Sequence, residues 1–522
     1  MISINRNIQS EILMTTMEEL VPEDSLFRKV DKYIDFTFIY DRVKDLYSSD
    51  NGRPSIDPVV LFKLVFIQAI DGLKSMRQTC KKIKVDAEYR WFLGIPFGHD
   101  TPHFSTFSKN YERRFKDSNI FEEIFIEIVN QAIRYNLVDG TTFYTDSTHK
   151  KANANKNKYD DCVVQNIKQR RKWLEEEINE ERKKQGKKEF EYKDEIEEKH
   201  IKVSKTDKES GYYHRDNKEK GFMYLDHRTV DDKCNIIVDC YITKGNVHDS
   251  EPFIGRCEYI KRIFGFDIKK YAVDSGYLTL DIKKYFIDNN IFGVFGYRRY
   301  GSQESRKEKA KYEYVKEVDV YYEKETGEVL EYKGKIDKNG YKTYQNIDKT
   351  KIVRRHIHEE WNEQFRENRH SEEGKELYQK RKEHVERSFA DSKQNHGYRY
   401  AMYKGIKKNQ HYTWLICAAQ NMKNIAIKKD KIKRNASIYV AFFKKITNTL
   451  RKLQEVYQNF KKLKTLRKNL GVCLHSEKKS LKVTFLSFLF LFIIYLIILS
   501  KILIFYFNYI NWYDFFVTFI LK

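Results

Sequence analysis

The chain has 522 residues, too many for one ordinary domain, so we expect three or four folding units. Lysine and arginine outnumber aspartate and glutamate by 98 to 75, and the net charge of +23 favours a polyanionic partner, either a nucleic acid or an acidic membrane face. An aromatic share of 15% excludes a disordered basic tail protein, and the seven scattered cysteines, with no CxxC pair, exclude a disulfide framework and a cysteine-built zinc site.

Residues 1–20 carry charges and lack a continuous apolar run, so we expect no signal peptide and a cytoplasmic protein. Residues 1–116 are predicted to form an all-helical N-terminal domain. Asp57-Pro58 is typical of a helix start, with Asp as N-cap and Pro at the first position, and Asp71-Gly72 is a turn signal that ends the helix. A second short helix is predicted to begin near Ser75.

That second helix carries the basic residues Arg77, Lys81 and Lys82. Two helices joined by a glycine-containing turn, the second of them basic, are typical of a helix-turn-helix that binds DNA. A helical hairpin that only packs on the next domain explains the same pattern equally well.

After an amphipathic helix at 117–136 the pattern changes to strands. Residues 141–146 are β-branched and aromatic, which predicts a strand with Asp146 at its end. Residues 163–200 are dense in charge with apolar residues at helical spacing, so we expect a solvated helix or helical hairpin there. The next predicted elements are strands at 222–230 and 234–243, a helix at 250–264 capped by Asp249 or Ser250, a strand at 270–273 ending at Asp274, a helix at 279–289, a strand at 291–297, a β-leaning stretch at 301–360, and helices at 372–396 and 409–429.

This order predicts an α/β fold of the ribonuclease-H-like kind, a mixed sheet with helices on both faces. The domain is predicted to span 117–430, with a charged helical or coiled-coil insertion at about 157–220 and a β-leaning one at about 300–370. A basic helical segment at 431–480 and a hydrophobic tail at 481–522 follow.

Three carboxylates fall where such a fold can hold a metal. Asp146 and Asp274 end neighbouring predicted strands, which lie about 4.8 Å apart, so they can share a cation. Glu386 is the best third acid, because Lys393 lies seven residues later on the same helical face and can contact a phosphate; Glu383 is its rival. Clustered carboxylates suit two Mg²⁺ ions, with Mn²⁺ as a substitute, in phosphodiester cleavage.

Other polar residues have structural explanations. Asp226 and Asp239 also lie in predicted strands, and we expect them to pair with neighbours such as His227 or Arg228. Three further residues soon after Asp146 either orient a DNA backbone or, slightly favoured, shape a turn: Asn153, Asn155 and Lys156.

Long strings of the sequence carry a family resemblance. They are GRPSIDPVVLFKL and TPHFSTFSKNYERRF near the N-terminus, and then YTDSTHKKANANK, KGFMYLDHRTVDDKCNIIVDCYITKGNVHDSEPF, YAVDSGY, RKEHVERSFADSKQNHGYRYA and AAQNMKNIA. On these strings the chain resembles insertion-sequence transposases of the IS1182 type, within the IS4-like group, over roughly residues 10–430.

The resemblance implies a metal-dependent DNA transposase that binds the terminal inverted repeats and the target duplex, as a homodimer in the synaptic complex. It implies a metal-binding triad at Asp146, Asp274 and Glu386. The wider group's signature on the last helix matches Tyr378, Arg381, Glu386 and Lys393, with one extra residue between Arg381 and Glu386. An inactive or host-domesticated DNA-binding derivative is the alternative.

Two features depart from the family. Relatives carry a cysteine cluster before the catalytic helix, whereas residues 301–380 here contain no cysteine. In the tail, Val483–Ser500 is an uncharged run of 18 residues, long enough for a marginal membrane span. The tail is interpreted as translated A/T-rich flanking DNA, favoured for a DNA-joining enzyme, or as a membrane anchor.

Overall fold

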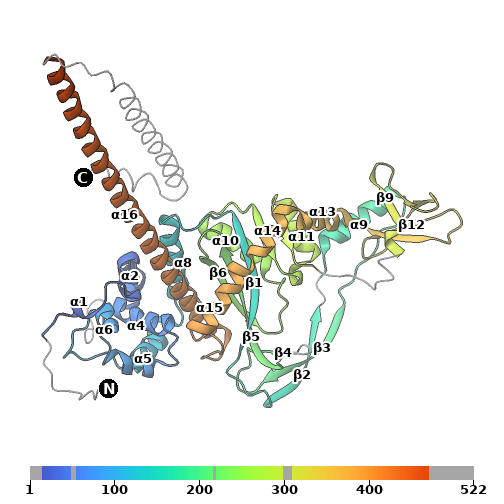
Figure 1. Ribbon diagram of the computed structural model, residues 1–522. Helices are drawn as coiled ribbons and strands as arrows, with labels where there is room; N and C mark the ends of the chain where they lie inside the picture. The colour runs from blue at the N-terminus through green and yellow to red at the C-terminus, as the bar shows by residue number, and fades with distance from the viewer. Residues whose placement is uncertain (1–13, 49–54, 168–169, 215–218, 298–307, 470–522) are drawn as a thin grey trace, which may run out of the picture. The chain divides into compact units, whose positions relative to one another are not determined.

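The structure, a computed structural model, describes residues 14–48, 55–167, 170–214, 219–297 and 308–469. The chain divides into two compact units, residues 1–428 and 429–522. The first unit holds the helical N-terminal part, a mixed central sheet and two insertions (Figure 1).

Helices make up the N-terminal part. They are α1 (Met17–Leu20), α2 (Leu26–Tyr33), α3 (Phe38–Val43), α4 (Pro58–Ile70), α5 (Met76–Ile83), α6 (Ala87–Leu93), α7 (Ser105–Asn110) and α8 (Ile120–Arg134), with a 3-10 turn at Lys44–Leu46 and a π-helical turn at Tyr111–Phe115. The predicted helix starts are confirmed: Asp57 accepts from the Val59 and Val60 amides, and the Ser75 hydroxyl accepts from the Gln78 amide.

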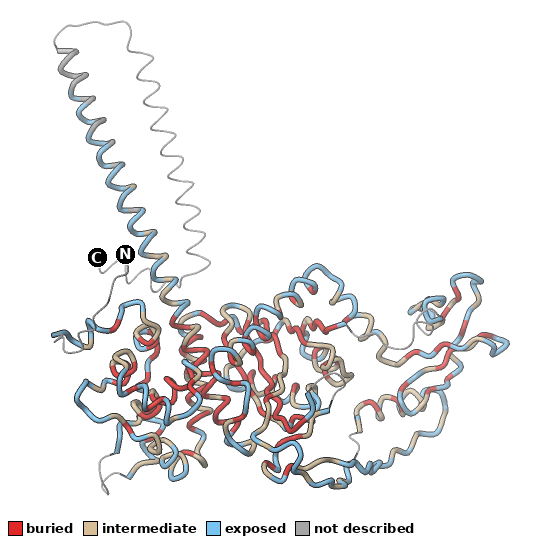
Figure 2. Tube along the Cα trace, turned by 60° about the horizontal axis from the view of Figure 1, so that its bottom comes forward, coloured by how far each residue is buried: buried red, intermediate tan, exposed pale blue. Residues whose placement is uncertain are grey.

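From Leu61 to Ile70 every side chain of α4 except Lys63 is buried, because this part of the helix is apolar on most sides and lies among the other N-terminal helices. Its Phe62 ring contacts Phe107, Phe115 and Phe121, so rings from α7, the π-helical turn and α8 close around it. Figure 2 shows buried residues gathered in these helices and again in the central sheet.

The central sheet contains β1 (Thr142–Lys151), β4 (Gly211–Tyr213), β5 (Gly221–Asp231), β6 (Ile237–Lys244), β7 (Lys270–Val273) and β8 (Phe292–Phe295). Strand β1 lies in the middle, antiparallel to β5 and parallel to β7, and β7 is parallel to β8. Both β6 and β4 pair with β5 in antiparallel fashion. The sheet is therefore mixed, and the order of its strands and helices follows the predicted order.

Alternation along β1 assigns the helices to the two faces of the sheet. On one face, the Phe143 and Thr145 side chains contact Tyr271, whose ring packs against Phe253 and Phe286. These two phenylalanines belong to α10 (Phe253–Phe264) and α11 (Leu280–Asp288).

The opposite face carries helices from the end of the first unit: α14 (Glu372–Lys380), a π-helical turn (Lys382–Glu386), α15 (Arg387–Asn395) and the part of α16 (Ile406–Asn469) that precedes Lys429. There the Tyr144 ring stacks on His384. Helix α16 also covers β6: the Gln410 side chain bonds to the backbone of Cys240 and Ile242, and the Asn421 side chain bonds to both backbone groups of Ile237. The side-chain amides of Gln410 and Asn421 thus form hydrogen bonds with backbone N–H and C=O groups of β6 that would have no partner at the edge of a sheet.

The first insertion corrects the prediction of a solvated helix or helical hairpin at 163–200. It consists of β2 (Tyr159–Ile167), α9 (Lys172–Lys184) and β3 (Ile196–Ser204), with β2 and β3 paired antiparallel. High charge density was compatible with strands because most charged side chains of the pair are exposed and one opposite-charge pair, Asp161 and Lys202, faces across it. The helix is not a coiled coil, since Leu174 and Ile178 pack against Ile336 of the second insertion.

The second insertion is β-rich, as predicted. Its antiparallel sheet runs β9 (Tyr312–Val315), β10 (Val320–Glu323), β11 (Val329–Ile336), β12 (Tyr341–Gln345) and β13 (Ile352–His356), with a 3-10 turn at Lys316–Val318, and α13 (Glu359–His370) follows. Its core contains Tyr321, Leu330, Tyr344 and Val353. The partly exposed Asp319 accepts from the Tyr314 and Tyr344 hydroxyls, so an aromatic core whose hydroxyls are bound by a carboxylate at its edge stabilises this cysteine-free sheet.

No helix within the described ranges is long and apolar enough to cross a membrane. The run Val483–Ser500, on which the membrane-anchor hypothesis rests, lies outside those ranges.

Candidate active site

Asp146 lies in the middle of β1, not at its end, because pairing with β5 continues to Lys151. Its Oδ1 accepts from the Ser147 amide at 2.9 Å, and its Oδ2 accepts from Arg381 Nη2 at 2.5 Å. Burial is the main cause that raises the pKa of the Asp146 carboxyl to about 6; the charges of Asp274 and Asp249 add to the rise, while Arg381 opposes it. The carboxylate is thus held among other acids and stabilised by one guanidinium.

Asp274 directly follows β7 and begins a 3-10 turn at Ser275–Tyr277. Because Thr145 and Val273 are partners in the parallel register, Asp146 and Asp274 occupy the next positions of neighbouring strands. Gly296, just after β8, makes room for this arrangement. A Cβ atom there would lie 2.8 Å from Asp274 Oδ1, 2.8 Å from the Tyr378 hydroxyl and 2.6 Å from the Ser275 amide nitrogen.

The predicted helix at 372–396 is interrupted by the π-helical turn at Lys382–Glu386. The Glu386 amide contacts the Arg381 carbonyl at 3.4 Å, five residues back, instead of four. The turn therefore holds one residue more than an α-helical turn, which suits the longer spacing between Arg381 and Glu386 that the resemblance implies. Arg381 Nη1 lies 3.5 Å from Glu386 Oε1.

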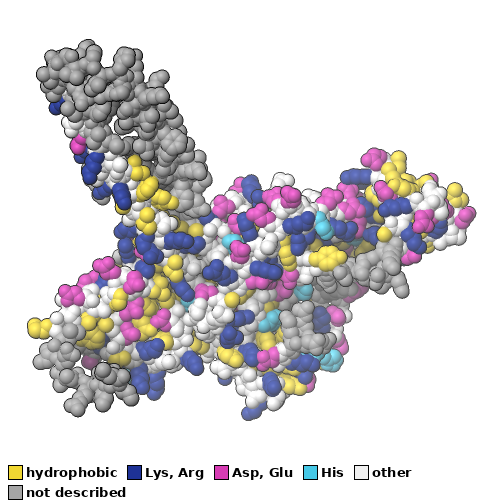
Figure 3. Space-filling model, viewed as in Figure 1, with side chains coloured by type: hydrophobic (Ala, Val, Ile, Leu, Met, Phe, Trp, Pro, Cys, Tyr) yellow, Lys and Arg dark blue, Asp and Glu magenta, His cyan; other side chains and the backbone are white. Residues whose placement is uncertain are grey.

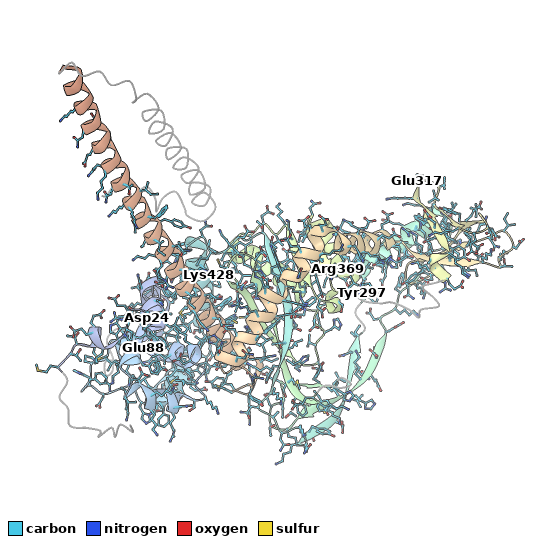
Figure 4. The ribbon with its side chains drawn as sticks, in the orientation of Figure 1. Asp24, Glu88, Tyr297, Glu317, Arg369 and Lys428 are labelled. Atoms are coloured by element: carbon cyan, nitrogen blue, oxygen red, sulfur yellow. The ribbon has the colours of Figure 1, made fainter. Side chains whose placement is uncertain are left out.

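The two remaining residues of the helix signature, Lys393 and Tyr378, lie beside β1 and beside the end of β7. Lys393 Nζ donates to Thr148 Oγ1 at 2.5 Å, two positions beyond Asp146 on the same face of β1. The Tyr378 hydroxyl lies beside Asp274 at Gly296, and the guanidinium of Arg369, labelled in Figure 4, covers the Tyr378 ring at 4.1 Å. Residues from β1, β7, α14 and α15 are therefore brought together.

The oxygen donors of Asp146, Asp274 and Glu386 suit a hard divalent cation. Arg381 lies between Asp146 and Glu386, and in the part of the chain that the structure describes no three Asp, Glu, His or Cys side chains are close enough to hold a metal ion. The donor set fits magnesium chemically, and Arg381 supplies the positive charge between two of the carboxylates. The Glu386 side chain is 45% exposed, so it faces solvent.

Asp249 is an acid of this site that sequence reasoning assigned to a helix cap. Helix α10 begins later, at Phe253 behind Pro252, without a side-chain cap. Asp249 Oδ1 instead accepts from the Ser147 hydroxyl at 2.6 Å, and its Oδ2 packs over Gly276. Only the string GNVHDSEPF, within the longest stretch of family resemblance, pointed to this residue.

A buried ion pair supports the site from β5. Asp146 faces Arg228 across the strand pair, and the guanidinium of Arg228 lies 2.9 Å from Asp226 with both side chains fully buried. Arg228 Nη1 also donates to Ser392 Oγ at 2.7 Å on α15 and to Gln420 Oε1 at 3.0 Å on α16. The predicted pairing of Asp226 with Arg228 is confirmed.

Other predicted residues lie outside this cluster. Asp239 pairs with Arg256 of α10 and not with a strand neighbour. Asn155 Oδ1 accepts from the Asn157 amide at 2.9 Å, which supports its turn-shaping role. Glu383 is exposed, and its backbone carbonyl accepts from the Asn235 side chain.

The basic residues proposed from the helix-turn-helix pattern, Arg77, Lys81 and Lys82, lie on α5, where both lysines are exposed. Among the described residues none of the three forms an ion pair with a carboxylate, so their charges are not neutralised there. Figure 3 shows basic and acidic side chains interspersed over the visible face of the first unit. A local group of basic side chains without neighbouring carboxylates therefore indicates where an anionic partner binds better than the net charge of the chain does.

Two family models match the chain. Residues 15–113 match a transposase domain (DUF772), and residues 302–426 match a transposase DDE domain. The combination is typical of IS1182-type transposases and confirms that resemblance. The second match includes Arg381 and Glu386, whereas Asp146 and Asp274 precede it.

A search of curated proteins finds no match. Among solved structures, the Mos1 transposase paired-end complex with left transposon end is similar, at 10% sequence identity over 52% of this chain and 76% of that chain. The TM-score is 0.14, a likeness too slight to bear on fold or function.

Proposed function

The chain carries the transposase domain and the transposase DDE domain typical of IS1182-type insertion-sequence enzymes, and we propose that it cuts and joins DNA at the ends of such an element. The observation that carries the proposal is the contact of Arg381 with both Asp146 and Glu386, beside Asp274, on one face of a mixed sheet. These acids come from β1, from the end of β7 and from the Lys382–Glu386 turn, and they supply the oxygen ligands that a metal-dependent phosphodiester site uses.

We infer that the central sheet is ribonuclease-H-like. The strand order β6-β5-β1-β7-β8, with the first three antiparallel and the last three parallel, supports this assignment. The predicted limits of the helical domain, 1–116, and of the catalytic domain, 117–430, are part of the same proposal.

In this proposal Asp146, Asp274 and Glu386 would hold two Mg²⁺ ions, once Arg381 no longer lies between two of them. When bound, such ions supply positive charge to the phosphate and an activated water or 3′-hydroxyl. Arg381 releases Asp146 Oδ2 and places its guanidinium toward a phosphate oxygen, which it can bind through two N–H groups. Lys393 holds a second phosphate oxygen from its place beside Thr148.

Only through the ions that they would hold could the carboxylates act on an anionic DNA strand, first at each element end and then on the target duplex. The duplex partners are the terminal inverted repeats and the target DNA, held by a homodimer in the synaptic complex.

Strand cleavage tests the three acids. We expect Asp146→Asn, Asp274→Asn and Glu386→Gln to abolish nicking of an end duplex in Mg²⁺, because each removes a charged oxygen donor, while gel-shift binding of the same duplex persists. Glu383→Gln, three residues away on the same helix, is the matched control and should cut normally. Nicking by Asp146→Asn at the unsubstituted rate would refute the assignment.

A further inference from the structure

A basic pocket of about 300 Å³ lies on the N-terminal helices, inside the string TPHFSTFSKNYERRF. Helix α7 and the π-helical turn that follows it provide most of its lining. Three cations line it, Lys109, Arg113 and Arg114, together with polar groups that include His103, Ser105 and Asn110.

No acidic side chain lines this pocket. Lys109 and Arg113 are exposed, and neither forms an ion pair with any described residue. Glu112 is next to Arg113 in sequence but pairs with Lys408 at 2.7 Å and Lys116 at 3.7 Å. The positive charge of the pocket is therefore not compensated within the described structure.

Neutral groups hold Arg114 in position. Its guanidinium donates to Asn110 Oδ1 and lies 4.5 Å from the centre of the Tyr47 ring. A guanidinium fixed in this way loses little conformational entropy when it binds an anion, and its remaining N–H groups stay available.

The backbone next to the pocket is unusual. The Lys116 amide donates to the Tyr111 carbonyl at 2.9 Å, five residues back, so Arg113 and Arg114 lie on a widened turn. Turns of this kind are rare and frequently occur at functional sites. This observation is independent of the charges that line the pocket.

The pocket is joined to the basic helix α5 through one aromatic ring. The Arg77 guanidinium lies over Phe104 at 4.2 Å, and the His103 ring lies against the same Phe104 at 4.1 Å. Arg77 on α5 and His103 in the pocket are thus neighbours on one surface. A duplex bound at α5 would have further phosphates within reach of the pocket.

We propose that this pocket binds a backbone phosphate of duplex DNA next to the stretch contacted by α5. The proposal rests on the proposed function and adds a second contact region to the N-terminal part. Guanidinium and hydroxyl donors match the anionic oxygens of a phosphodiester. Contacts of this kind position a duplex without reading its bases, so the pocket contributes equally on any sequence.

Fluorescence anisotropy with the full chain tests the pocket, in an Asp146→Asn background that prevents cutting. The probes are two labelled duplexes of unrelated sequence, each titrated over a series of salt concentrations. We expect Arg113→Gln to weaken binding to both duplexes by about tenfold, the loss of one charge-assisted contact. The slope of log affinity against log salt should fall by about 0.9, the value for one phosphate.

Arg262→Gln on α10 removes an exposed arginine elsewhere and should change neither affinity nor slope. Lys109→Gln provides a second variant of the pocket with the same expected direction. Unchanged affinity and slope in both pocket variants, with native circular dichroism, would overturn the proposal. A loss confined to one duplex would also overturn it, since that indicates base recognition. If the unsubstituted chain bound neither duplex, the proposed transposase function itself would fail.

Discussion

Gly296 is the residue on which the placement of Asp274 depends most directly. Its missing side chain leaves room for the Asp274 carboxylate, the Ser275 amide and the Tyr378 hydroxyl, all within 2.8 Å of where a Cβ atom would lie. Real Cβ atoms do not approach backbone this closely, so any larger residue must move Ser275 and with it Asp274.

We therefore expect Gly296→Ala to reduce strand cleavage at least tenfold and to cost about 1–3 kcal/mol of stability, the usual cost of overpacking. DNA binding should persist, because the N-terminal helices are untouched. Gly255→Ala is the matched control: it lies in α10 with no atom within 4 Å of the added methyl group, and should keep full activity. Equal cleavage by the two variants would contradict this explanation.

Lys150 lies on the same face of β1 as Asp146 and is fully buried, with its Nζ 4.1 Å from the centre of the Tyr398 ring. Burial lowers the pKa of Lys150 to about 7. The unfolded chain, in which lysine has its ordinary pKa of about 10.4, binds the proton more tightly. Between these two pKa values, this residue alone should increase the free energy of unfolding by about 1.4 kcal/mol for each pH unit.

Lys150→Met should remove this contribution to the pH dependence of the free energy of unfolding, and it should raise that free energy at neutral pH. Urea unfolding at a series of pH values between about 7 and 10 measures the difference. Lys184→Met, which replaces an exposed lysine at the end of α9, serves as the control and should leave the slope unchanged. An identical slope in Lys150→Met and the unsubstituted chain would contradict a lowered pKa.

Helix α15 is held to the sheet by Arg228. This residue bonds to Asp226 within β5 and reaches Ser392 on α15 and Gln420 on α16, with no exposed surface of its own. Removing one partner of a buried pair leaves an uncompensated charge in a medium that solvates it poorly.

Arg228→Met should therefore destabilise the chain by about 3–5 kcal/mol, measured by denaturant unfolding. The double variant Arg228→Met with Asp226→Asn should recover part of the loss, since no unpaired charge remains. Lys333→Met, which breaks an exposed pair with Glu331, should change stability by no more than about 1 kcal/mol. If Arg228→Met lowered the free energy of unfolding by no more than Lys333→Met does, the structural role of Arg228 would be contradicted.

Local signals predicted helix starts and strand positions well. The caps at Asp57 and Ser75 could be predicted because each capping hydrogen bond joins residues only two or three positions apart in the sequence. Strand β7 ends where predicted, directly before Asp274. The end of β1 could not be predicted locally, since its continuation to Lys151 depends on pairing with the distant β5.

The candidate site was predictable only in part. The sequence indicated which residues belong to it, but not that Arg381 would bridge Asp146 and Glu386, because that contact depends on a π-helical turn. Asp249 was predicted to cap a helix, since an acid that precedes a helix usually does so. Its position in the candidate site is evident only from the tertiary hydrogen bond with Ser147.

At the scale of the whole molecule, the division at Lys428 separates a packed part of α16 from an exposed part. The buried residues of α16 lie between Asn409 and Ala426 in the first unit, among them Ile416, Met422 and Ile425, and Gln410 and Asn421 complete the edge at β6. Beyond Lys428, the helix residues whose burial is described are all exposed or partly exposed.

We expect a chain ending after Asn435 to fold, bind duplex DNA and melt within a few degrees of the full chain. A chain ending after Gly405 should fail to fold cooperatively, because it loses the buried face of α16 and the two amides on β6. Circular dichroism melting and size-exclusion chromatography distinguish the two. Loss of folding in the longer variant would contradict the division of the chain.

The π-helical turn at Lys382–Glu386 has a consequence for how such chains are compared. An insertion in an ordinary helix rotates everything beyond it by about 100° around the axis, because each residue adds that angle. Here the wider hydrogen-bond spacing is confined to one turn, and Arg381 on one side of it contacts both Asp146 and Glu386. The spacing of a helical motif can therefore change by one while its spatial pattern stays the same, and searches for distant homologues gain by allowing a single gap between these two positions.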